Sequence, residues 1–90
     1  MLNLGPQSKA WLADIGILTL TQLQARDAVV VYGAIKARQT KASINLLYAF
    51  VGAQQGLHWL EVAKHQKMDL LMRLEAYKEM AQVGAVDGLK

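Results

Sequence analysis

Two histidines and a glutamate in the C-terminal third of the chain are the residues to consider first for metal chemistry. If residues 58–65 are helical, His58, Glu61 and His65 share one sector of that helix. Imidazole and carboxylate groups are zinc ligands, but this spacing matches no known ligand signature. The chain also contains no cysteine that would supply a thiolate. We therefore predict that the protein binds no metal and no cofactor.

A second candidate site lies at the N-terminus, where Gly5 precedes the expected start of a helix at Pro6. Backbone N–H groups at a helix N-terminus bind phosphate, and Ser8 and Lys9 follow within the next turn. The alternative is that Gly5 and Pro6 only begin a helix, which is the commoner role of a lone Leu-Gly-Pro.

Further cations would extend this site if the third predicted helix lies beside the N-terminal hairpin. The candidate nucleic-acid-binding residues are then Gly5, Ser8, Lys9, Arg26, Lys36, Arg38 and Lys41. Four added charges are few, and a solvated basic face is the alternative interpretation.

The net charge of +3 belongs to the first two-thirds of the chain. Residues 1–60 hold five Lys or Arg and two Asp or Glu, which gives 5 − 2 = +3. Residues 61–90 hold five of each, which gives 5 − 5 = 0. Any basic surface therefore has to be built from residues 1–60.

Features of catalysis and of membrane attachment are not recognisable in the sequence. No nucleophile, base and orienting group follow a catalytic pattern, and there is no glycine-rich phosphate loop. We predict a protein that is not an enzyme and has no small-molecule substrate. A signal peptide and a stretch of roughly 20 apolar residues are also lacking, so we expect a cytoplasmic protein without membrane contact.

Helices must position these residues, because Leu, Ala, Gln, Lys and Met dominate the composition. The most apolar stretch runs from Ser43 to Gly56 and carries almost no charge. A helix that is apolar nearly all round has to be buried on most of its circumference. We predict a central core helix here, with Ser43 as N-cap and Gly56 as C-terminal stop.

The N-terminal part is predicted to form two short helices. The first begins at Pro6, which needs no hydrogen-bond partner for a backbone N–H, and ends at Gly16. The second helix, from Leu20 to about Ala25, has two local signals. Its capping box pairs Thr19 with Gln22, and its hydrophobic staple pairs Leu18 with Leu23.

Two more helices complete the expected fold. Asp27 caps a third helix, which runs from Ala28 to Arg38. The valine run in this segment would also suit a strand, but the residues that follow it continue the helical spacing. The last helix follows Trp59 and ends near Ala81, and residues 82–90 are predicted to be a flexible tail.

The last helix has two apolar stripes on different sides. Its predicted inward face is Leu70, Leu74, Tyr77 and Ala81, flanked by Leu71. Met68 and Met72 lie on another side with Glu75 and Glu79. We interpret these two methionines as a protein interface for a weak homodimer, with coverage by the fold itself as the equal alternative.

The order of several motifs carries a family resemblance. The N-terminal motif residues are Leu4-Gly5-Pro6-Gln7-Ser8-Lys9, Leu12, Gly16-Ile17-Leu18-Thr19 and Leu23. This run resembles the second half of a helix-hairpin-helix module. The later motif residues are Ala28-Val29, Tyr32, Ser43 to Ala49, Gly52-Ala53 and Gly56 to Trp59. Over residues 2–75 the chain is similar to the C-terminal domain of TfoX/Sxy-type competence regulators.

Three positions depart from the family patterns. Val51 stands where an acidic residue is common, no proline follows Trp59, and Asn3 replaces the first glycine of the hairpin. The resemblance implies a compact, all-α, five-helix domain over residues 1–81, with a helix-hairpin-helix-like N-terminal half around the buried central helix. It also implies a bacterial protein that regulates transcription for DNA transformation through DNA phosphates, transcription proteins or both. The competing interpretation is an oligomerisation module that does not bind nucleic acid.

Overall fold

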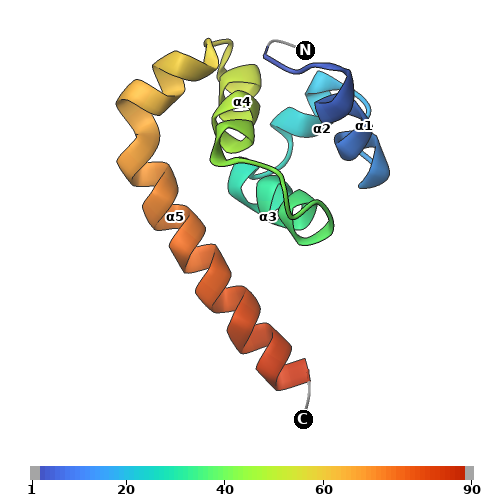
Figure 1. The fold of residues 1–90 in the computed structure, drawn as a ribbon, viewed down its shortest axis with the longest axis vertical. Coiled ribbons are helices and arrows are strands. Elements are labelled where there is room, and N and C mark those ends of the chain that lie inside the picture. Colours follow the sequence, from blue (N-terminus) through green and yellow to red (C-terminus); the bar gives the residue numbers. More distant parts are fainter. Residues whose placement is uncertain (1–2, 89–90) are drawn as a thin grey trace.

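The structure, a computed structural model, describes the backbone of residues 3–88 and the side chains of residues 3–81. The described residues form five helices and no strand, so the predicted all-α fold is confirmed. The helices are α1 (Pro6–Asp14), α2 (Leu20–Gln24), α3 (Ala28–Arg38), α4 (Ile44–Gln55) and α5 (Trp59–Gly88). The long helix α5 passes along one side of the other four and extends beyond them (Figure 1).

Helix α4 is the centre of the hydrophobic core, as predicted. Every residue from Leu46 to Ala53 is buried, and α4 packs against α2, α3 and α5. Gly56 ends the helix in the left-handed conformation with φ at 72°. Ser43 is the N-cap, as predicted, although its side chain makes no capping hydrogen bond. Burial on several sides, rather than its cap, stabilises this helix.

The α1–α2 hairpin has the predicted local structure with one exception. Thr19 Oγ1 accepts a hydrogen bond from the backbone N–H of Gln22 at 3.2 Å, and Gln22 Oε1 accepts one from that of Thr19 at 3.1 Å. This confirms the capping box. The predicted staple is wrong, because Leu18 is 68% exposed while Leu23 is fully buried. Gln22 Oε1 also accepts from the backbone N–H of Leu18 at 2.6 Å, so polar contacts close this turn.

Helix α3 begins and ends where the sequence predicts. Asp27 accepts a hydrogen bond from the backbone N–H of Val29 at 2.8 Å, which confirms the cap. The buried residues of α3 are Ala28, Val29, Val31, Tyr32 and Ile35. Burial raises the pKa of the Tyr32 phenol above its ordinary value of 10.0.

Helix α5 contacts the core along a single stripe that includes Val62, Leu70 and Leu74. Tyr77 is half-buried, but Ala81 is exposed, so the predicted inward face is wrong at its last residue. The helix also continues to Gly88, past its predicted end. Glycine within a helix costs about 1 kcal/mol and need not terminate it. Within the described residues, no helix has the length and apolar character to cross a membrane.

The predicted flexible tail lies largely outside the described side chains. The backbone of residues 82–88 is helical, whereas residues 89–90 are outside the described part of the chain. The flexibility of residues 82–90 therefore stays a prediction.

Candidate interaction surfaces

Asn3 connects the N-terminal segment to the junction between α4 and α5. Its side-chain amide donates a hydrogen bond to the Leu57 carbonyl at 2.8 Å, and its side-chain oxygen accepts one from the backbone N–H of Trp59 at 3.2 Å. Asn3 has φ at 68°, the left-handed conformation that glycine adopts most readily. A side chain at Gly52 would overlap both Asn3 and Leu57. Asn3, at the first glycine position of the hairpin, therefore links the N-terminal segment to the junction between α4 and α5.

The first three candidate phosphate-binding residues lie together at the start of α1. Gly5 is the N-cap and is exposed, and Lys9 is exposed in the first turns of the helix. Ser8 is half-buried. A Cβ atom added to Gly5 would meet nothing within 4 Å, and its φ is −86°. Glycine is therefore not required by the fold at this position.

Two of the four remaining candidate cations donate hydrogen bonds to backbone carbonyls. The Lys36 amine donates to the carbonyl of Thr40 and, at 2.7 Å, to that of Ala42, and so closes the loop between α3 and α4. The Arg38 guanidinium donates to the Asp14 carbonyl at 3.4 Å. This contact places the C-terminal end of α3 beside the C-terminal end of α1.

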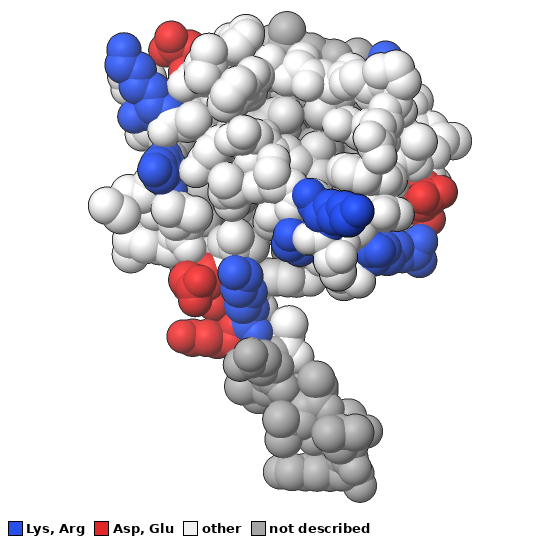
Figure 2. All heavy atoms as spheres, viewed as in Figure 1, with Lys and Arg blue, Asp and Glu red and all other residues white. Residues whose placement is uncertain are grey.

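The candidate cations do not form one continuous patch. Lys36, Arg38 and Lys41 are at the C-terminal end of α3 or in the loop after it, whereas Arg26 precedes the helix. The 11 residues of α3 separate these ends by about 15 Å. Lys9 is in the first half of α1, five residues before the Asp14 carbonyl that Arg38 contacts. Figure 2 shows Lys and Arg atoms gathered over the end of α3, with acidic atoms beside them.

The histidines and glutamate considered for a metal make separate contacts. His65 Nε2 lies 3.3 Å from Glu61 Oε2, one helical turn away, and both side chains are exposed. His58 Nδ1 instead accepts a hydrogen bond from the backbone N–H of Leu60 at 3.2 Å, at the start of α5. In the described part of the chain, no three His, Cys, Asp or Glu residues are arranged to hold a metal ion.

Comparison with protein families identifies most of this fold. The family model of the TfoX C-terminal domain matches residues 1–74, from the N-terminal segment through α4 and into α5. The chain belongs to the TfoX C-terminal domain family. Comparison with curated proteins and comparison with solved structures each gave no match. The match ends at Leu74, and the part of α5 that follows lies outside the matched residues.

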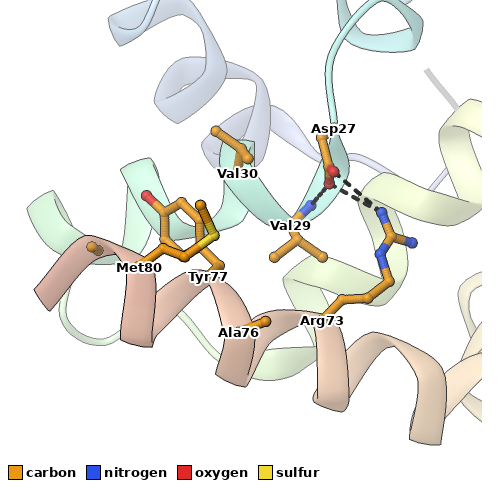
Figure 3. Close-up of a pocket in the computed structure, with 8 residues that line it drawn as sticks. Asp27, Val29, Val30, Arg73, Ala76, Tyr77 and Met80 are labelled. Atoms are coloured by element: carbon orange, nitrogen blue, oxygen red, sulfur yellow. Dashed lines mark hydrogen bonds and ion pairs between the residues drawn. The ribbon is translucent and has the colours of Figure 1, made fainter. Parts of the chain in front are cut away.

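A groove of about 600 Å³ lies between α3 and this later part of α5 (Figure 3). Its apolar lining includes Val30, Tyr77 and Met80. At one end, the Arg73 guanidinium lies 3.3 Å from both carboxylate oxygens of Asp27. Asp27 thus caps α3 and also links it to α5, a role that the sequence analysis missed. In the sequence, Arg73 lies between Leu70 and Leu74 of the predicted inward face, which indicates that it is near the core. The sequence does not indicate that Asp27 is the residue it pairs with.

The Tyr77 ring fits against α3 because Gly33 has no side chain. A Cβ atom at Gly33 would overlap the ring carbons of Tyr77. Tyr77 packs against the core but follows the last residue that the family model matches.

The outward face of α5 carries exposed methionines, so the alternative that the fold covers them is wrong. Met68 is 75% exposed and Met72 is 67% exposed, on the side opposite the buried Leu70. A shallow depression beside them is lined by Leu71, Met72, Glu75, Ala76 and Glu79. We call Met68, Met72 and the adjoining charged residues the outer α5 face.

Proposed function

We propose that this chain is a non-catalytic regulatory domain that binds protein through the outer α5 face, in the control of DNA transformation by a bacterium. The observation that carries the proposal is the exposure of Met68 and Met72, one turn apart and opposite the core. Flexible, polarisable methionine side chains are frequent at protein-binding surfaces. Neighbouring exposed apolar side chains are typical of interaction sites.

Membership of the TfoX C-terminal domain family supports the regulatory role. The resemblance to competence regulators implies control of transcription, which proceeds through contacts with other macromolecules. Nothing in such a role requires a reaction at this domain. Protein binding by the outer α5 face is therefore sufficient for the proposed function.

Direct DNA binding is the less favoured mechanism. Lys36 and Arg38 already donate to backbone carbonyls, and Arg26 lies at the other end of α3. A protein that neutralises several phosphates needs its cations on one continuous surface, because affinity rises with the number of counterions released. The candidate cations are divided between separate parts of the fold.

Transformation frequency in a bacterium that carries the full protein tests the proposal. We expect Met68→Lys with Met72→Lys to lower the frequency at least about tenfold, because charges replace the apolar contact, a loss of about 1.4 kcal/mol or more. The matched control, Met68→Leu with Met72→Leu, keeps an apolar surface and should retain the wild-type frequency. Equal protein levels and equal melting temperatures exclude misfolding as the cause.

A second set of variants distinguishes protein binding from DNA binding. Lys9→Gln, Arg26→Gln and Lys41→Gln remove three exposed candidate cations without altering the two that hold the loops. We expect the triple variant to retain the transformation frequency of the wild type. Loss of transformation in this variant, together with duplex DNA binding by the wild type that weakens steeply with salt, would support the DNA mechanism instead. Wild-type transformation by the methionine-to-lysine variant would overturn the proposal.

A further inference from the structure

We infer that the partner on the outer α5 face is a second copy of this chain, bound antiparallel. The inference rests on the proposed function, which assigns this face to protein binding. Its basis is the order of charges along the face: Lys64 precedes the methionines, whereas Glu75 and Glu79 follow them. All three charged side chains are exposed, and Glu75 also lies 3.8 Å from Lys78 of its own helix.

An antiparallel arrangement makes this surface complementary to itself. A two-fold axis brings the first half of one helix against the second half of the other. Residue numbers rise along one helix as they fall along its antiparallel partner. If Met68 of one copy faces the partner's Met72, the residue numbers of every facing pair therefore add up to about 140. Lys64 then lies opposite the partner's Glu75, and the same pair forms a second time across the axis. Two ion pairs thus flank a central contact of four methionines.

A parallel arrangement lacks this complementarity. It would place Lys64 beside the partner's Lys64 and Glu75 beside the partner's Glu75, and like charges at short distance repel. The interval from Glu61 to Glu79 holds four Lys or Arg and four Asp or Glu, so 4 − 4 = 0. Two copies of this part of α5 therefore associate without net charge repulsion.

The same register also contains two unfavourable pairs, because Glu61 of each copy lies opposite the partner's Glu79. The contact is limited to one face of one helix, so the surface area that it buries is below the roughly 1,200 Å² of a stable interface. We therefore expect a weak dimer with a dissociation constant of about 10–100 μM.

Sedimentation equilibrium of the full chain over a range of concentrations tests the dimer directly. The wild type should show a monomer–dimer equilibrium, and Met68→Lys with Met72→Lys should weaken it at least about tenfold. Circular dichroism melts at low concentration confirm that each variant remains folded.

Charge reversals test the register. Glu75→Lys should weaken the dimer because it faces the partner's Lys64. Glu79→Lys, the same chemical change one turn later, should strengthen the dimer because it faces the partner's Glu61. Combining Glu75→Lys with Lys64→Glu should restore wild-type affinity, since the pair is exchanged rather than lost.

Each result bears separately on the dimer and on the proposed function. If the wild type is monomeric at millimolar concentration, the dimer is overturned. If Met68→Lys with Met72→Lys nevertheless lowers the transformation frequency, the proposed function stands, with another protein as the partner. A dimer lost in that variant while transformation persists supports the dimer and overturns the function. Equal effects of Glu75→Lys and Glu79→Lys, or failure of the charge exchange to restore affinity, overturn the antiparallel register.

Discussion

Helices α4 and α5 are both rich in apolar residues, but they use them differently. In α4, the buried residues follow one another without interruption from Leu46 to Ala53. In α5, a buried stripe that includes Leu70 alternates with exposed residues such as Met68 and Met72. The difference shows that apolar content alone does not define a core helix. A helix surrounded by others is buried on most sides, whereas a helix at the edge keeps one face exposed.

The contacts that hold the two helices differ as well. Apolar burial dominates around α4, where Phe50 and Leu47 are fully enclosed. Helix α5 is also attached through specific contacts on its flanks. Gln66 donates to Gln55 of α4 at 2.8 Å, and Arg73 is paired with Asp27. The later part of α5 therefore depends on a few contacts, and each can be removed separately.

Removal of the Phe50 side chain should have the largest effect. Phe50→Ala leaves a cavity in the most enclosed part of α4, so we expect the free energy of unfolding to fall by about 3–5 kcal/mol. Urea denaturation followed by circular dichroism measures this change. Leu18→Ala, at a position that is largely exposed, is the control and should change stability by less than about 1 kcal/mol. Equal losses in both variants would mean that α4 is not the core helix described here.

Gly33→Ala should change the free energy of unfolding by an intermediate amount, and the sign of this change should depend on whether Tyr77 is present. In the wild type, the added methyl group displaces the Tyr77 ring from α3, and we expect a loss of about 1–2 kcal/mol. In a Tyr77→Ala background the space is free, and alanine should stabilise α3 by about 0.5–1 kcal/mol over glycine. Denaturation of the four variants in this cycle gives the coupling energy. The same sign in both backgrounds would contradict the contact.

Substitution of the outer α5 face should have the smallest effect on the monomer. Met68→Lys and Met72→Lys remove no buried contact, so we expect the free energy of unfolding to change by no more than about 0.5 kcal/mol each. The measurement is made at a concentration low enough to exclude self-association. A loss above about 1 kcal/mol would show that the methionines support the fold, and would remove the contrast between α4 and α5.

Most helix boundaries could be predicted from the sequence because they depend on residues a few positions apart. The Thr19–Gln22 capping box, the Asp27 cap and the left-handed Gly56 all involve local backbone geometry. The burial of α4 followed from its composition, since so apolar a helix has no stable solvent-exposed arrangement. The ordered motifs also predicted the family to which the chain belongs.

Only the tertiary structure decided which distant residues meet. Asn3 reaches Leu57, Arg38 reaches Asp14, and the Asp27 cap also binds Arg73. Such contacts depend on how helices pack, and packing is determined by many side chains at once rather than by any local pattern. The sequence by itself therefore determined the helices and their order. The exposure of the α5 methionines, the division of the basic residues and the attachment of α5 through Arg73 and Tyr77 required the assembled fold.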